Sequence, residues 1–140
     1  VLCFLLGYFL YLAFPAAPPR LVLAQQYRVH LLGGPVTGLA DSALRLLPTD
    51  SRAAFPSLHA AVSVLVLGYA WRRVRGLFWP LLLAVLGLLV STVYLRHHFV
   101  ADLLAGFALA PCAAWLAPRL DRAWSARQRE LGYAPALGAE

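Results

Sequence analysis

The sequence predicts an all-α fold, a multi-pass transmembrane helical bundle, and it does so through its composition and its hydropathy pattern. Hydrophobic residues make up 61% of the 140-residue chain and charged residues only 13%, whereas about one quarter of an average soluble domain is charged. Apolar runs close to the roughly 20 residues that a helix needs to cross a bilayer alternate with polar stretches. We therefore expect helices that lie in a membrane and pack against one another.

Four apolar runs are the candidate spans of this bundle. The first, residues 1–14, begins inside an apolar stretch and ends at Pro15, because proline cannot continue a helix. We expect this run to be a truncated span. The links between the later runs are short enough for antiparallel neighbours in a bundle. These runs are residues 57–71, 77–95 and 99–117.

Polar side chains recur too often in residues 15–56 for a further span, so we expect a loop there. Apolar residues at three- and four-residue spacing predict short helices within it, at 21–32 and 36–47. The arginine-rich end of the chain is typical of a short amphipathic helix. The predicted organisation is a membrane-embedded domain, residues 1–117, truncated at its N-terminus, followed by a cytoplasmic tail, residues 118–140.

All 12 basic residues are arginines, and their positions predict the orientation of the bundle. Cytoplasmic loops are enriched in arginine and lysine, and most of these arginines lie in the 72–76 link and in the tail. The 15–56 loop, the start of the 57–71 run and the 96–98 turn then share the extracytoplasmic face. The arginines on that face suit a phosphate site, although a GC-rich genome explains the arginine content equally well. Because the arginines are divided between two faces, we expect no nucleic-acid partner.

Two histidines, a serine and an aspartate on that face carry the predicted chemistry. His98 and Asp102 are four residues apart, so they share a helix face and the carboxylate can orient the imidazole. His98 can then attack a phosphorus atom and form a phosphohistidine. Ser57, at the start of another helix, can donate a hydrogen bond to phosphate, and His59 can act as general acid and base. Three arginines can neutralise phosphate charge: Arg20, Arg52 and Arg96.

Short motifs around these residues resemble a known family. Pro56 to His59 resembles P-S-x-H, the second signature of the type 2 phosphatidic acid phosphatase superfamily, and His98 to Asp102 resembles its third, H-x-x-x-D. The segments Phe14–Arg20, Phe55–Ala60 and Ser91–Tyr94 resemble the inositol phosphorylceramide synthase branch, an inositolphosphotransferase group, and its bacterial relatives. The resemblance covers roughly residues 10 to 117.

The resemblance implies a core of six helices, four of them visible, so we expect two more upstream. It implies a lipid or polyprenyl phosphate substrate and an integral protein of a bacterial plasma membrane, with the active site on the extracytoplasmic side. It also implies that His98 is the nucleophile, Asp102 its partner, His59 the acid and base, and Ser57 a phosphate ligand. No cofactor is expected, and the oligomeric state stays open.

Two departures from the family pattern concern the phosphate ligands. The first signature has a lysine followed at a distance by Arg-Pro, but this chain contains no lysine, so Arg20 stands in for the arginine only. The third signature commonly begins Ser-Arg, whereas here Ser91 is followed by Thr92. Arg96 is the candidate replacement. These departures favour the phosphotransferase-like branch over the common phosphatases.

Three function classes remain open at this point. The first is the phosphatase or phosphotransferase, and the second is a metal-dependent hydrolase with His59, His98 and Asp102 as ligands, which we disfavour because no separate general base is present. The third is a transporter or scaffold with a structural His/Asp pair. Asp102 by itself is equally well explained as a helix cap. We interpret His97 as an interfacial bystander, and we expect no metal at Cys3 or Cys112, which lie in apolar runs.

Overall fold

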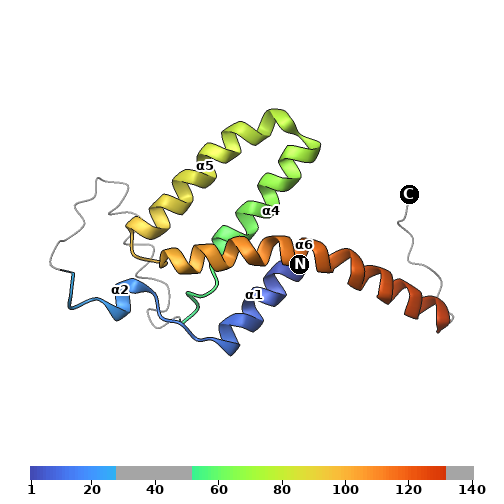
Figure 1. Cartoon of the computed structure of the whole chain (residues 1–140), viewed down its shortest axis with the longest axis horizontal. Helices are drawn as coiled ribbons and strands as arrows, with labels where there is room; N and C mark the ends of the chain where they lie inside the picture. The colour runs from blue at the N-terminus through green and yellow to red at the C-terminus, as the bar shows by residue number, and fades with distance from the viewer. Residues whose placement is uncertain (28–51, 132–140) are drawn as a thin grey trace.

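The computed structural model describes residues 1–27 and 52–131, and within them the fold is all-α, as the sequence predicts (Figure 1). These two stretches contain no strand, only an isolated bridge between Ala16 and Ala53. The predicted helix at 36–47 lies outside the described residues. The helices are α1 (Leu2–Ala13), α2 (Pro19–Val22), α4 (Leu58–Arg73), α5 (Arg75–Tyr94) and α6 (Val100–Glu130).

Two of the described helices are long and apolar enough to cross a membrane, α5 with 20 residues and α6 with 31. Only 11% of the most apolar window of α5 is buried inside the protein. Large side chains such as Leu83 and Val90 therefore point outward. Water makes such a surface unfavourable, whereas lipid suits it. The two helices thus indicate a membrane protein.

Helices α1 and α4 occupy the other two predicted spans but are shorter than a bilayer crossing. With 12 and 16 residues, they measure about 18 and 24 Å at 1.5 Å per residue, against a hydrocarbon core of about 30 Å. Helix α4 begins directly after Ser57, whose side chain accepts a hydrogen bond from the N–H of Ala60. The prediction of four spans is confirmed in length and hydropathy for α5 and α6.

The ends of two elements differ from the prediction. Helix α6 continues through Pro111 and Pro118 to Glu130, where the sequence predicted a span that ends at residue 117 and a separate tail helix. Each proline removes one backbone hydrogen bond, but the turns on either side keep theirs and continue the helix. The predicted helix at 21–32 does not form in its described part, since α2 ends at Val22 and a turn follows.

Helix α4 is the central helix and packs against α1, α5 and α6 (Figure 1). Small residues let membrane helices approach closely, and Ala60, Ala61 and Ala110 have no exposed surface. At Gly106 of α6, a Cβ atom would lie 2.8 Å from the Cβ of Ala60 and would collide with the carbonyl oxygen of Ser57. This close approach holds the first turns of α4 and α6 side by side.

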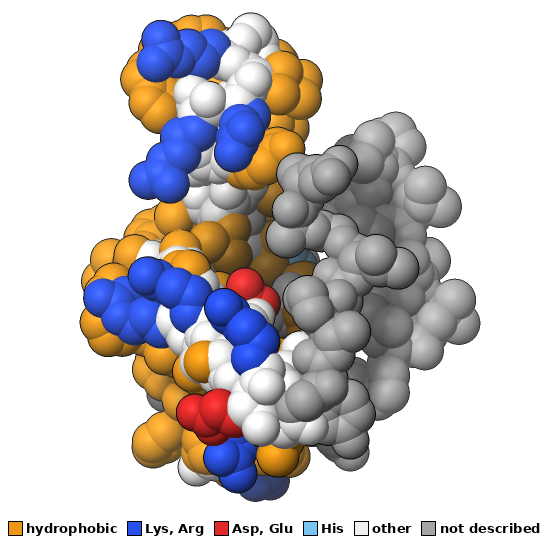
Figure 2. Space-filling model, turned by 90° about the vertical axis from the view of Figure 1, so that its right-hand side faces the viewer, with side chains coloured by type: hydrophobic (Ala, Val, Ile, Leu, Met, Phe, Trp, Pro, Cys, Tyr) orange, Lys and Arg blue, Asp and Glu red, His pale blue; other side chains and the backbone are white. Residues whose placement is uncertain are grey.

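Apart from Arg52, the exposed arginines of the described residues lie away from those first turns. Figure 2 shows them over the link between α4 and α5 and along the C-terminal part of α6. Arg72 and Arg73 end α4 and Arg75 begins α5, while Arg119 and Arg122 lie in α6 beyond Pro118. The charge distribution therefore separates the two ends of the bundle.

Candidate active site

The turn between α5 and α6 places His98 at the start of α6. The backbone N–H groups of His97 and His98 both donate to the carbonyl oxygen of Thr92, at 2.9 and 3.2 Å. Arg96 adopts a φ of 61°, the left-handed region that residues other than glycine seldom occupy. This tight reversal leaves the His98 side chain only 7% exposed.

A backbone carbonyl and a carboxylate hold the buried His98 ring. Its Nδ1 lies 3.0 Å from the carbonyl oxygen of Ala54 and 3.6 Å from Oδ2 of Asp102. A carbonyl oxygen can only accept a hydrogen bond, so Nδ1 carries the proton and Nε2 keeps its lone pair. Sequence reasoning singled out Asp102 but missed Ala54, because a backbone carbonyl has no residue-type signature.

Asp102 caps the start of α6 and also lies near the His98 ring. Its Oδ2 accepts a hydrogen bond of 2.7 Å from the N–H of Phe99, which caps the start of α6. The distance of 3.6 Å from Oδ2 to Nδ1 of His98 is too long for a normal hydrogen bond. It is short enough for the carboxylate charge to stabilise positive charge on the ring.

Burial lowers the pKa of His98 below its ordinary value of 6.5, and the charge of the neighbouring His59 lowers this pKa further. The carboxylate of Asp102 and the carbonyl of Ala54 act in the opposite direction but do not outweigh burial. The imidazole is therefore neutral at neutral pH. This is the form in which Nε2 can attack an electrophile.

His59 and Ser57 lie beside His98 at the start of α4. The rings of His59 and His98 meet edge to face, with their centroids 5.7 Å apart. Ser57 is fully buried, and its Oγ accepts a hydrogen bond of 3.4 Å from the N–H of Ala60. The N–H of Ser57 donates to the carbonyl oxygen of Asp102 at 2.9 Å. The backbones of the two histidine motifs are thus joined directly.

The three arginines proposed from the sequence lie in different surroundings. The N–H of Arg20 donates to the carbonyl oxygen of Arg96 at 3.0 Å, which ties α2 to the His98 turn. Within the described residues the buried Nε of Arg20 has no hydrogen-bond partner, and an anion would satisfy this donor. The guanidinium of Arg96 lies over the ring of Tyr27, 3.6 Å from its centroid. Arg52 is exposed.

Both histidine motifs lie within a stretch that matches a known family. The family model of the PAP2 superfamily matches residues 1–116, which include α1, α4, α5 and the first half of α6. The chain belongs to the PAP2 superfamily. No curated protein and no solved structure matches it. Because the superfamily is generally composed of phosphatases, this PAP2 protein has a phosphatase-type phosphoesterase function.

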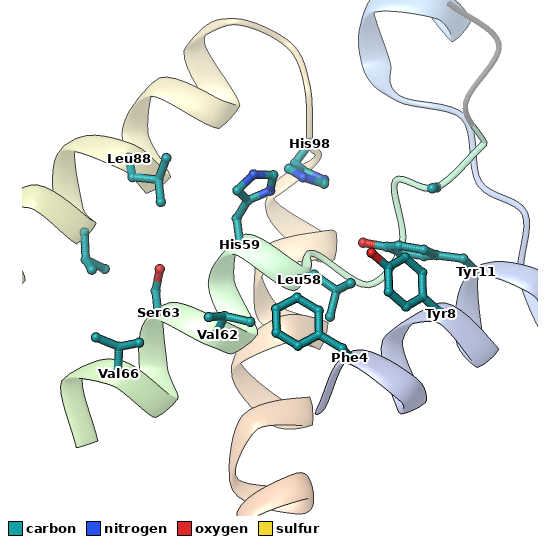
Figure 3. A pocket seen from close by; sticks show the side chains of 12 residues that line it. Phe4, Tyr8, Tyr11, Leu58, His59, Val62, Ser63, Val66, Leu88 and His98 are labelled. Atoms are coloured by element: carbon teal, nitrogen blue, oxygen red, sulfur yellow. The ribbon is translucent and has the colours of Figure 1, made fainter. Parts of the chain in front are cut away.

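A cavity of about 470 Å³ opens beside the two histidines of this PAP2 protein (Figure 3). His59 and His98 lie next to each other along one side of it. Most of the remaining wall consists of apolar side chains from α1, α4 and α5, such as Phe4, Val62 and Leu88. The arrangement therefore places two imidazole rings beside an apolar space.

The structure offers no metal-ligand cluster in the stretches that it describes, 1–27 and 52–131, where no group of three or more His, Cys, Asp or Glu side chains could hold an ion. Both cysteines are free, with Cys3 buried in the core and Cys112 exposed on α6. Four of the six predicted site residues meet where α4 and α6 begin, while Arg20 and Arg96 lie on the adjoining segments. These four are Ser57, His59, His98 and Asp102.

Proposed function

We propose that this PAP2 protein cleaves the phosphate ester of a lipid or polyprenyl phosphate through a phosphohistidine intermediate on His98. The main support is the hydrogen bond that Nδ1 of His98 donates to the carbonyl oxygen of Ala54, because it leaves the lone pair on Nε2. The cavity beside His98 is apolar over most of its wall, which suits a lipid chain.

In the first step, Nε2 of His98 attacks the phosphorus atom. The P–N bond forms as the P–O bond to the lipid breaks, and protonated His59 donates its proton to the leaving oxygen. The carboxylate of Asp102, 3.6 Å from Nδ1, stabilises the positive charge that develops on the ring. We assign the phosphate oxygens to Arg20, Ser57 and Arg96, and the unsatisfied Nε of Arg20 supports the first of these.

In the second step, His59 removes a proton from an incoming hydroxyl, whose oxygen attacks the phosphorus and breaks the P–N bond. Water as the acceptor gives inorganic phosphate, and a lipid or sugar hydroxyl gives a new phosphate ester. The absence of lysine and of the Ser-Arg pair favours transfer, as in the inositol phosphorylceramide synthase branch.

The proposed site faces the extracytoplasmic side of a bacterial plasma membrane. The exposed arginines of the α4–α5 link and of α6 lie toward the C-terminal ends of α4 and α6, whereas His59 and His98 lie at the start of these helices. Since arginine is enriched in cytoplasmic segments, those C-terminal ends are the cytoplasmic ones in our proposal.

The decisive experiment follows ³²P-labelled phosphatidate with the purified full-length protein in detergent micelles. We expect release of labelled phosphate and, after rapid quenching, a labelled protein whose P–N bond is stable to alkali and labile to acid. Adding an alcohol acceptor separates hydrolysis from transfer. His98→Ala is expected to abolish both the labelled protein and turnover, a loss of about a thousandfold or more.

His97→Ala is the matched control, since it removes the adjacent imidazole and is expected to keep labelling and turnover. A His98→Ala protein that keeps its thermal unfolding midpoint and full turnover would refute the nucleophile. The result would favour the alternative in which the His/Asp pair is structural in a transporter or scaffold.

A further inference from the structure

A serine hydroxyl on α4 interrupts an apolar part of the cavity wall. Ser63 of α4 lines the cavity together with Phe4, Val62 and Leu88. Only 7% of this residue is exposed. Figure 3 shows the hydroxyl on the same side of α4 as the His59 ring. A polar group at this position needs an explanation, because the side chains around it on this part of the wall, Val62, Val66 and Leu88, are apolar.

The hydroxyl of Ser63 makes no hydrogen bond within residues 1–27 and 52–131, unlike the hydroxyls of Ser91 and Thr92 on α5. A serine or threonine inside a helix ordinarily donates back to a carbonyl of the preceding turn. Ser91 does so to the carbonyl of Leu88 and Thr92 to that of Leu89, both at 2.8 Å. The hydroxyl of Ser63 therefore faces the cavity, and its donor is available to a molecule that occupies this space.

The spacing along α4 relates this donor to the reaction centre. Ser63 follows His59 by four residues, so both lie on one helix face with a rise of about 6 Å between them. In the proposed reaction His59 protonates the oxygen that links the phosphate to the lipid. In a glycerol-based lipid phosphate, the first acyl ester carbonyl lies a few covalent bonds beyond that oxygen, at a comparable depth.

We propose that Ser63 determines substrate specificity by donating a hydrogen bond to an acyl carbonyl of the lipid, one helical turn below the phosphate. The inference rests on the proposed function, and it narrows the substrate to lipid phosphates with a polar linkage. A polyprenyl phosphate is hydrocarbon at that depth and leaves the hydroxyl unpaired. Sites built to hydrogen-bond a substrate discriminate against analogues that lack the partner.

The test compares three substrates with the purified full-length protein: a diacyl glycerol phosphate, its dialkyl ether analogue of equal chain length, and a polyprenyl phosphate. We expect kcat/KM to be highest for the diacyl lipid. Ser63→Ala is expected to lower kcat/KM for this lipid by about threefold to tenfold, the size of one hydrogen bond. The same variant should leave the other two substrates unchanged, and Ser63→Thr should restore the preference.

Ser91→Ala is the matched control, because Ser91 lies on α5, is not part of the cavity wall and bonds to its own helix. It should leave all three values unchanged. A Ser63→Ala variant that keeps the ratio between the substrates, whether by losing nothing or by losing all equally, would overturn the inference. Wild-type protein that turns over none of the lipids would instead overturn the proposed function.

Discussion

Replacing Gly106 by alanine tests whether the close approach of α4 and α6 positions the catalytic groups. The new Cβ would lie 2.8 Å from the Cβ of Ala60 and would collide with the backbone oxygen of Ser57, against ordinary carbon contacts of about 3.5 to 4.0 Å. Backbone atoms cannot rotate away, so the two helices must separate by about 1 Å. Overpacking of this kind costs about 1 to 3 kcal/mol of stability.

The same displacement moves His59 away from His98, since the first lies on α4 and the second at the start of α6. A misplacement of about 1 Å can cost about a hundredfold in rate. We therefore expect Gly106→Ala to lower both the thermal unfolding midpoint in detergent and kcat for phosphate release. Gly68→Ala on α4 is the control, because its Cβ would meet nothing within 4 Å. If the two variants behave alike, the interface does not position the site.

Three further predictions concern charge. As the pH falls through the lowered pKa of His98, we expect kcat/KM to decline, because protonation removes the lone pair of the nucleophile. As the pH falls from about 6.5 to that lower pKa, the free energy of unfolding should decline, because His98 takes up its proton in the unfolded chain first. Asp102→Asn removes a charge that raises this pKa, so the acidic limb of the pH–rate profile should move to lower pH. The same change should reduce kcat by about tenfold to a hundredfold, whereas an unmoved limb would contradict the assigned contact. Arg20→Gln should lower kcat/KM by about tenfold to a hundredfold if its Nε binds phosphate. Arg20→Lys should restore kcat/KM only in part, because lysine lacks the planar fork of the guanidinium. Full restoration would show that the positive charge at position 20 is sufficient and that the Nε contact is not needed.

The residues of the proposed site could be singled out from the sequence because their motifs are local. The four-residue spacing of His98 and Asp102 defines a shared helix face wherever the helix lies. The apolar run of α5 likewise predicts a membrane span from composition alone, and the helix forms at Arg75–Tyr94, close to the predicted 77–95. Predictions that depended on where a helix ends were weaker, as the continuation of α6 through Pro118 shows.

Other features depend on segments that are distant in sequence. The carbonyl of Ala54 holds Nδ1 of His98 across 44 positions, and every residue type has such a carbonyl. Arg96 lies over Tyr27 in a turn where its own φ is positive. The sequence has no glycine at this position to indicate such a turn. Ser63 reads in the sequence as one small polar residue in an apolar helix.

The sequence by itself determined that the chain is a helical membrane protein with a P-S-x-H and an H-x-x-x-D motif, because helix periodicity and side-chain chemistry are local properties. Only the tertiary structure decided that Ala54 orients the His98 ring, that Gly106 sets the distance between α4 and α6, and that Ser63 faces the cavity. These features arise from packing between helices. A backbone carbonyl or a small residue contributes there through where it lies in space, and only the folded chain fixes that position.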